Sequence, residues 1–379
     1  MLRTPYASER IQKFDPTTGI KVIQLTSYPL PSAHFRYYTS SVTPDNQRVV
    51  FFCQRFAGRD APWDIFRCDT DGLNLFQLTE WGDKHSDGGY YGRGPAVMSL
   101  DGATVYVIFN DVLHAVDVET GESRDLCSLE KFHPEGTKFG AIYPFRDEKL
   151  YVIRRGDPVI TLCVDQKTGE VSELDLGGNV MGCFHDEGRI VVQRGTVKWG
   201  TTGHRAGARE VKNVGAQLSI WSVDQNGGDE QFISGQIYAH ATPLGRKSAF
   251  QGCGLPPNRC IWLAENGQEP RKLCEGPYFW HSGASMDGEW IIADTNWPDQ
   301  GLQLIHVPTG NFRTLCHPGA SLDHIEYGHP HPSLSHDGRI AVFRSDRTNI
   351  SQVYVALITD EFRESVIAGD LNGRDKWMM

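Results

Sequence analysis

Several features that mark particular classes of protein are missing from this chain of 379 residues. It has no run of lysine or arginine, and 37 basic residues against 47 acidic ones give a net charge of −10. Nucleic acids and anionic membrane surfaces are bound by basic surfaces, so we expect no nucleic acid and no membrane as partner. An anionic ligand would need a locally basic pocket. No apolar stretch is long enough to span a bilayer, and the first ten residues lack the apolar core of a signal peptide, so we expect a cytoplasmic protein.

The sequence also lacks the patterns of disulfide frameworks, zinc sites and serine hydrolases. Its nine cysteines are an odd number, scattered without Cys-x-x-Cys spacing and mostly placed within apolar runs. They are expected to be small buried hydrophobes. No Gly-x-Ser-x-Gly elbow occurs, since the nearest segment, 283–287, ends in aspartate. A propeller-type peptidase would also need a further catalytic domain that this length cannot hold, which disfavours a serine hydrolase.

Internal repetition is what the sequence does contain. A polar turn with Asp or Gly, followed by an apolar strand, predicts a hairpin each time it appears. The seven copies are at 43–52, 99–107, 146–152, 185–192, 243–250, 285–292 and 335–343. Most are followed by a second hairpin with an Asp-x-x-Thr-Gly type turn, clearest at 115–121, 163–169 and 306–310. Two hairpins make a four-stranded blade, so the chain is predicted to be an all-β, seven-bladed β-propeller.

The two ends of the chain predict how the ring closes. Segment 14–26 has the form of a second hairpin but precedes the first blade, whereas the last blade ends at 353–358 with no strand after it. We therefore expect the N-terminal strand to complete the last blade, which hides the open sheet edges. No linker or low-complexity segment appears, so residues 1–379 are expected to form a single domain. Segment 195–215, polar and rich in glycine, has the character of an inserted loop.

A pair of histidines stands at the start of the last blade. On an extended backbone, His329 and His331 point to the same side and both imidazoles can face one ion. Pro330 and Pro332 favour and stiffen an extended path. Imidazole binds first-row divalent ions, and Glu326 would add the hard oxygen that Mn, Fe or Zn accept. The alternative is a pair of loop histidines that hydrogen-bond to the backbone.

Two more histidines precede the turn phrases of the fifth and sixth blades at similar distances, His240 and His281. The first strands of propeller blades line the central channel, and the loops that lead into them form one mouth. Histidines from three neighbouring blades are therefore expected to converge, with His281 as the third imidazole for the ion. The alternative for each is an ordinary polar residue at the start of a strand.

Motifs at both ends of the chain resemble a known family. These are Asp-Pro-x-Thr-Gly-x-x-Val-x-x-Leu-Thr at 15–26, His-Phe-Arg-Tyr-Tyr at 34–38, the block around His281, and His-Pro-His-Pro-Ser at 329–333. Together they are similar to the oligogalacturonate lyases of pectin degradation, which are seven-bladed propellers that need manganese. The likeness is good over about 13–80 and 270–350 and weak between them.

The resemblance implies a divalent cation, manganese in that family, held by His281, His329 and His331. The fourth position is Glu326, where the family has glutamine. An anionic ligand lowers the effective charge of the ion and should weaken its hold on a substrate carboxylate. Both the metal and the substrate therefore stay open at this point.

The resemblance also implies a catalytic base, His240, through the short phrase at 240–249. The family's catalytic arginine falls on Gln217 or Ser219 in this chain. Either that arginine is lost, or Arg205 or Arg209 from the inserted loop takes its place.

The reaction implied is β-elimination across a uronate in an acidic oligosaccharide, which gives a 4,5-unsaturated product. Sugar faces stack on aromatic side chains, although packing within or at the rim of a blade is the alternative for each of them. The residues expected to bind substrate are His34, Arg36, Tyr37, Tyr38, His85, Tyr90, Trp280 and Trp297.

Two other functions remain open. One is a propeller without enzymatic activity that binds a peptide or protein, like the TolB-type scaffold domains, and it predicts no tightly bound metal. The other is a lyase for a different uronate oligomer, which the glutamate at 326 and the unplaced arginine would suit. The sequence gives no indication of the oligomeric state.

Overall fold

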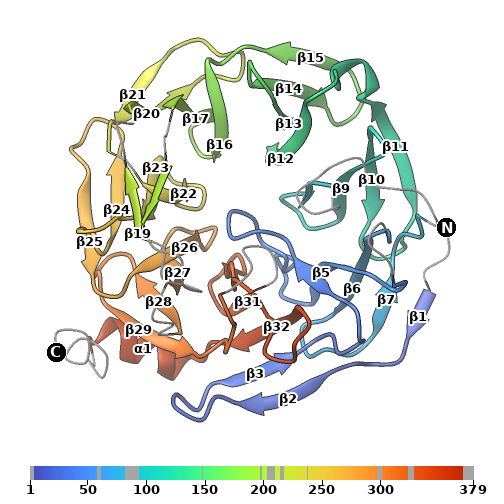
Figure 1. Ribbon diagram of the computed structural model, residues 1–379, viewed down its shortest axis with the longest axis vertical. Coiled ribbons are helices and arrows are strands. Elements are labelled where there is room, and N and C mark those ends of the chain that lie inside the picture. The colour runs from blue at the N-terminus through green and yellow to red at the C-terminus, as the bar shows by residue number, and fades with distance from the viewer. Residues whose placement is uncertain are drawn as a thin grey trace.

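The structure is a computed structural model that describes most of the chain. The described residues are 4–57, 61–81, 94–146, 148–196, 199–202, 210–213, 217–236, 238–296, 301–322 and 328–369. Seven antiparallel sheets stand around a central channel, with the chain running once around the ring (Figure 1). The predicted seven-bladed β-propeller is confirmed.

Each blade has four strands, of which the first in the chain is innermost. Blade one consists of β4 (Ser32–His34), β5 (Arg48–Cys53), β6 (Asp64–Asp69) and β7 (Leu75–Gln77). Blade two consists of β8 (Ala96–Met98), β9 (Thr104–Phe109), β10 (Val112–Asp117) and β11 (Ser123–Ser128). Blade three consists of β12 (Lys138–Phe145), β13 (Lys149–Arg155), β14 (Ile160–Asp165) and β15 (Val171–Leu174). Blade four consists of β16 (Gly178–Phe184), β17 (Arg189–Thr196), β20 (Gln217–Val223) and β21 (Gln231–Ser234). Blade five consists of β22 (Ala239–Pro243), β23 (Ala249–Cys253), β24 (Cys260–Glu265) and β25 (Arg271–Glu275). Blade six consists of β26 (Phe279–Ala284), β27 (Trp290–Thr295), β28 (Leu302–His306) and β29 (Phe312–Cys316). Blade seven consists of β30 (Ser333–Leu334), β31 (Ile340–Ser345) and β32 (Gln352–Leu357), and its fourth strand comes from the N-terminal segment.

The N-terminal segment closes the ring as predicted and then adds to it. Strand β3 (Lys21–Gln24) pairs with β32, placing Ile23 opposite Val355, so it is the fourth strand of blade seven. Strand β2 (Ile11–Phe14) lies outside β3 as a fifth strand. Strand β1 (Thr4–Tyr6) pairs with β7 of blade one, an addition that the sequence did not indicate. The N-terminus therefore binds both the last and the first blade.

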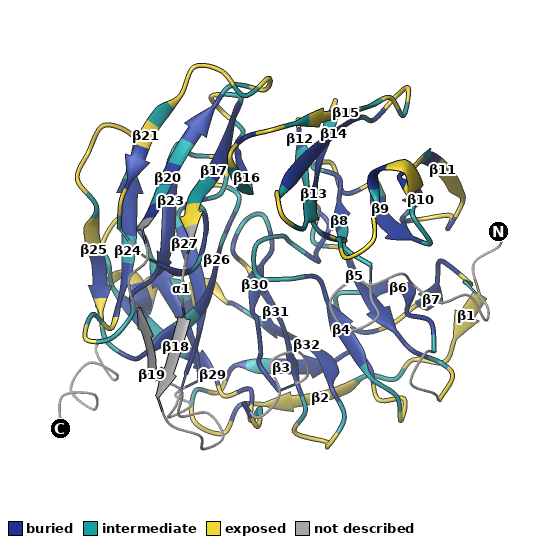
Figure 2. Ribbon diagram, turned by 45° about the horizontal axis from the view of Figure 1, so that its top comes forward, coloured by how far each residue is buried: buried dark blue, intermediate teal, exposed yellow. Residues whose placement is uncertain are grey.

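The side chains of the apolar strands are buried because every blade is packed between two others. Strands β27 and β31 are buried at every residue, whereas β1 and β2 are exposed along their length (Figure 2). Side chains from both faces of a strand enter clusters between blades, such as the one that joins Trp290, Leu334 and Phe343. Eight of the nine cysteines are buried and none of the nine forms a disulfide, as predicted.

The repeated turn phrases connect the first and second strands of their blades. In three blades a serine hydroxyl donates to the aspartate two residues later: Ser99 to Asp101 (2.6 Å), Ser285 to Asp287 (2.5 Å) and Ser335 to Asp337 (2.7 Å). The glycine that follows has positive φ, which suits a residue without Cβ. At Gly338 a Cβ would also come within 3.0 Å of Trp290 in the neighbouring blade. These turns therefore fix their three hairpins, and the turn at Gly338 also fixes the packing between two blades.

Three short additions complete the fold. Strands β18 (Trp199–Thr202) and β19 (Glu210–Asn213) form a separate hairpin between β17 and β20, within the predicted insertion. Helix α1 (Asp360–Ile367) packs against blade six through buried Phe362 and Val366. A 3-10 turn lies at Glu130–Phe132. Among the described residues, no helix has the length and apolar character needed to cross a membrane.

Candidate functional site

The inner strands of blades five and six are interrupted by bulges. In β22, Ala239 pairs with Cys253 and Thr242 with Gln251, so His240 and Ala241 fall within a break in the pairing. Strand β26 has the same break between Phe279 and Ser282, which contains Trp280 and His281. A bulge re-aims the side chains that it contains. This is how two inner strands come to present histidines toward the channel.

Four histidines from three neighbouring blades converge. The imidazole centroids of His281 and His331 are 3.9 Å apart, and those of His281 and His240 are 4.2 Å apart. His329 completes the histidine cluster, with its centroid 5.5 Å from that of His281 and 5.9 Å from that of His331. Three of the four are buried, while His240 is partly exposed to a large cavity. The structure thus brings together all four histidines singled out in the sequence.

The backbone at two of these histidines corrects one expectation. His240 has φ of 49° and His331 has φ of 46°, in the left-handed region that non-glycine residues seldom adopt. The extended path expected across 329–332 is therefore wrong at His331, and strand β30 begins only at Ser333. Packing between blades outweighs the local preference. Such conformations cost about 1–3 kcal/mol each and gather at functional sites.

An aspartate that the sequence analysis missed ties two blades together beneath the cluster. Asp294 of β27 accepts a hydrogen bond from the backbone N–H of His281 (2.7 Å) and another from that of His331 (3.1 Å). Its Oδ2 also lies 2.9 Å from Nδ1 of His281. A carboxylate behind an imidazole fixes the ring tautomer and orientation, as it does in many metal sites. The only signal in the sequence is a lone acidic residue inside the apolar strand at 290–295.

Burial and neighbouring charges oppose each other at Asp294. Burial raises its pKa to about 6, although His329, the backbone N–H groups of His281 and His331, and His240 each lower it. The carboxyl is therefore expected to be ionised at neutral pH.

A buried arginine, also missed, supports the histidine pair of blade seven. Arg344 of β31 donates from Nε to the carbonyl of His329 (2.9 Å), and its guanidinium contacts Nδ1 of His331. Burial lowers the pKa of His331 well below its usual range, and His281 and Arg344 lower it further. Burial likewise lowers the pKa of His281. These imidazoles are neutral at physiological pH, which is the form that binds metals.

The donor set of the cluster suits a divalent cation, although its rings are not arranged around one. Three imidazoles backed by a carboxylate match the preferences of first-row ions. Within the described ranges, however, no three side chains form a ready-made metal-binding group. Imidazoles bound to one ion radiate from it, so the rings of His281 and His331 would have to separate beyond 3.9 Å. Glu326, the predicted fourth ligand, lies outside the described residues.

Tyr37, on the loop between β4 and β5, lies among the imidazoles. Its hydroxyl is 3.3 Å from Nδ1 of His240, and its ring centroid is 5.3 Å from that of His281. Burial raises the pKa of Tyr37 above its ordinary value, so the phenol stays protonated. Its contact with Nδ1 favours one tautomer of His240 and restricts the ring.

Three members of the cluster, His240, His281 and His331, line a cavity of about 770 Å³ at one mouth of the channel. Two arginines, Arg36 and Arg155, line this cavity, and its described lining contains no aspartate or glutamate. In a chain with a net charge of −10, this is the locally basic pocket that an anionic ligand requires.

The other predicted site residues lie in different places. Arg36, Tyr37, Tyr38 and Trp280 line the cavity. The buried ring of His34 also lies at the cavity, and its Nε2 is hydrogen-bonded to the carbonyl of His331 (2.7 Å). Outside the described residues are His85, Tyr90, Arg205, Arg209 and Trp297.

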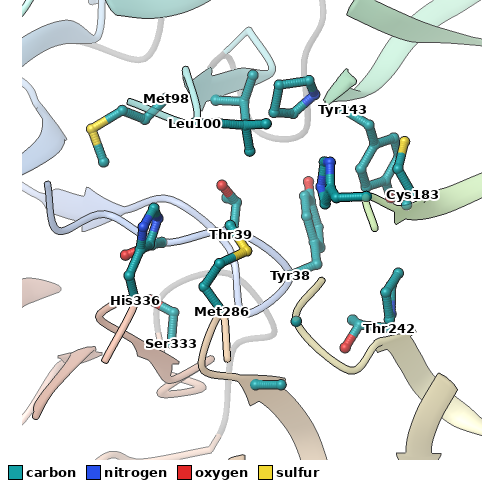
Figure 3. A pocket seen from close by; sticks show the side chains of 18 of the residues that line it. Tyr38, Thr39, Met98, Leu100, Tyr143, Cys183, Thr242, Met286, Ser333 and His336 are labelled. Carbon is teal, nitrogen blue, oxygen red and sulfur yellow. The ribbon is translucent and has the colours of Figure 1, made fainter. Parts of the chain in front are cut away.

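A second, smaller cavity of about 110 Å³ is lined by residues of the turns between first and second strands, such as Ser99 and Met286. Figure 3 shows Met98, Tyr143 and His336, among others, around Tyr38 and Thr39. Tyr37, Tyr38 and Tyr143 line both cavities, so these side chains stand between them.

Comparison with known proteins relates the whole fold to two lyases. An oligogalacturonate lyase solved in complex with manganese has a TM-score of 0.71 and 18% identity, over 95% of this chain and 99% of that one. An oligogalacturonate lyase from Vibrio parahaemolyticus has a TM-score of 0.72 and 18% identity, over 96% of this chain and 100% of that one. A chain of the mitotic checkpoint complex is less similar, with a TM-score of 0.57 and 13% identity over 92% of this chain and 97% of that one.

No protein-family model matches the chain, and no curated protein matches it in sequence. At 18% identity, a structural likeness establishes the fold, and a fold by itself does not give a function. The likeness to oligogalacturonate lyases, first indicated by motifs at both ends of the chain, thus extends over the whole propeller.

Proposed function

We propose that this protein is a lyase that cleaves short acidic oligosaccharides of the oligogalacturonate type by β-elimination. The observation that carries the proposal is the convergence of four histidines, of which His240, His281 and His331 line a basic cavity. The fold shared with two oligogalacturonate lyases supports it.

His240 is the base of this reaction. Burial lowers its pKa well below the ordinary value, and His281 lowers it further, so the imidazole is neutral and able to accept a proton. If Nδ1 donates its hydrogen to the hydroxyl of Tyr37, the lone pair of Nε2 remains for the substrate. Nε2 takes the proton from C5 of the uronate, a double bond forms between C4 and C5, and the C4–O bond breaks. The leaving oxygen departs with the electron pair and is then protonated.

The charge that develops on the carboxylate next to C5 must be balanced. A divalent cation held by His281, His329 and His331, manganese by the likeness to the first of the two lyases, would act there as a Lewis acid. Arg36 is the described arginine that acts electrostatically on three of the histidines, His240, His281 and His331. Its guanidinium can hold the same carboxylate through two hydrogen bonds. Arg205, Arg209 and Glu326 remain predictions from the sequence.

The test is cleavage of oligogalacturonates by protein loaded with Mn²⁺, followed by the ultraviolet absorbance of the unsaturated product. His240→Ala should lower kcat by about 10²- to 10⁴-fold, because it removes the base. EDTA should abolish the activity and Mn²⁺ should restore it. The matched control is His317→Ala, an exposed histidine outside the cavity, which should leave the rate unchanged. Absence of cleavage of any uronide, or cleavage indifferent to both His240→Ala and EDTA, would refute the proposed function.

A further inference from the structure

Arg155 stands across the cavity from the histidine cluster. It is the last residue of β13 in blade three, whereas the histidines belong to blades five to seven (Figure 1). The side chain is partly exposed and lines the large cavity. The neighbouring Arg154 differs, since it faces Glu173 (3.6 Å) and the carbonyl of Phe132. Successive residues of a strand point to opposite faces, so only one of the two arginines enters the cavity.

A glycine makes room for the Arg155 side chain. Strand β12 has a bulge between Phe139 and Ile142, and Gly140 lies within it. A Cβ on Gly140 would come 2.7 Å from Nε of Arg155 and 3.3 Å from its Cδ. Gly140 does not have positive φ, so its backbone does not require glycine. The guanidinium lies across the bulge because this position has no side chain.

The two arginines of the cavity come from different parts of the ring, Arg36 from the loop after β4 and Arg155 from the end of β13. Arg36 lowers the pKa of His240, His281 and His331, in each case behind the larger effect of burial. Arg155 is among the charges that act on the phenols of Tyr37 and Tyr143, which also line the cavity, and Arg36 acts on Tyr37 as well. Arg36 follows the inner strand of blade one and acts on the histidines, whereas Arg155 stands in blade three, so the two cations enter the cavity from different blades. Such spacing suits a ligand with two separate acid groups.

We propose that Arg155 anchors the carboxylate of the sugar next to the one that reacts. It is a specificity-determining residue, and it makes the preferred substrate an oligosaccharide with at least two adjacent uronates. The planar guanidinium binds a carboxylate through two hydrogen bonds. Asn179 and Gln193 of blade four line the same cavity and offer amides to sugar hydroxyls. This assignment rests on the proposed function, because the reacting sugar is placed by the histidine cluster.

The test compares two disaccharides. One is digalacturonate, and the other carries a methyl ester on the carboxyl of the leaving sugar only. The wild-type protein should favour the free acid in kcat/KM by about 10- to 100-fold, the effect of a charged hydrogen-bond pair, expressed mainly in KM. Arg155→Gln should lose this preference while kcat for digalacturonate stays within about threefold, because the group is remote from the base.

Two further variants separate anchoring from a loss of structure. Gly140→Ala keeps every charge but forces the guanidinium aside, so it should weaken the same preference. Arg154→Gln removes the neighbouring charge outside the cavity and should retain the preference for the free acid. Circular dichroism of each variant checks that the propeller folds.

Calorimetry of digalacturonate binding to EDTA-treated protein keeps this inference distinct from the lyase proposal. Arg155→Gln should weaken that binding by about 10- to 100-fold, and Arg154→Gln should not. If the variant binds, cleaves and discriminates like the wild type, the anchor is refuted while the lyase function stands. If the protein cleaves nothing yet binds the free acid in an Arg155-dependent way, the lyase function is refuted and the anchor stands. If there is neither cleavage nor binding, both are refuted.

Discussion

At the scale of single residues, the site depends on side chains that hold imidazoles rather than on the imidazoles alone. Asp294 and Arg344 are buried charges, which are expensive unless they are hydrogen-bonded. Both are hydrogen-bonded to the histidine cluster. Neither could be predicted from the sequence, because their partners belong to chain segments 13 to 37 residues away that only the packing of blades brings near.

Asp294→Asn tests this support. The change keeps the shape of the side chain but removes the charge behind His281, so the affinity for Mn²⁺ should fall by about 10- to 100-fold. Isothermal titration with Mn²⁺ measures this directly, without any substrate. Asp287→Asn, in the exposed turn of the same blade, is the matched control and should bind as the wild type does. Equal affinity in both variants would mean that Asp294 supports only the fold.

Tyr37→Phe tests the tautomer of His240. Removing the hydroxyl leaves Nδ1 without its 3.3 Å partner, so the ring can adopt the unproductive tautomer or rotate. We expect kcat to fall by about 10-fold with little change in KM, as for a lost hydrogen bond at a reacting group. Steady-state kinetics on digalacturonate measures both constants. A rise in KM alone would instead assign Tyr37 to substrate binding.

At the scale of elements, the hairpins could be predicted because their signals are local. A turn such as 335–338 carries its own hydrogen bonds from Ser335 to Asp337 and its own glycine, so seven copies identified seven blades. Strand β1 was missed, since its three residues are exposed and have no apolar pattern. The bulges at His240 and His281 were missed for a different reason. They depend on pairing with β23 and β27, which a strand's own residues do not reveal.

The closing hairpin offers a matched pair of isoleucines. Ile23 of β3 is fully buried against Val353 and Val355 of the last blade, whereas Ile11 of β2 is 41% exposed. Ile23→Ala should lower the free energy of unfolding by about 2–5 kcal/mol through lost burial and a cavity. Ile11→Ala should change it by less than about 0.5 kcal/mol. Urea denaturation measures both, and equal effects would contradict closure of the ring by β3.

At the scale of the whole molecule, the propeller divides its channel between a basic cavity and a smaller second cavity. Three histidines of the cluster and Arg155 line the first cavity, and two more histidines, His185 and His336, line the second. The sequence indicated the first group through the spacing of histidines before the turn phrases. It gave no sign that Tyr37 and Tyr38 would stand between the two cavities.

The second cavity predicts a pH dependence of stability. Burial, and to a smaller extent Arg246, lower the pKa of His185 to about 4, so the folded protein favours the neutral ring. In the unfolded chain the pKa is about 6.5. The contribution of His185 to stability is therefore fully present above about pH 6.5 and is lost as the pH falls toward 4.

His185→Gln should flatten the decline of stability between these two pH values. The free energy of unfolding, measured in urea at a series of pH values, provides the check. His317→Gln, which changes an exposed histidine, should keep the wild-type curve. An unchanged slope in His185→Gln would show that other groups cause the acid sensitivity.

The convergence of imidazoles on one cation is the claim on which the proposed chemistry depends. Crystals grown with Mn²⁺ and measured at the manganese absorption edge locate that ion directly by its anomalous scattering. We predict a single strong peak within bonding distance of His281, His329 and His331, with His240 nearby but not bound to it. A peak elsewhere, or none at a saturating concentration of Mn²⁺, would contradict the assignment of this cluster as a metal centre.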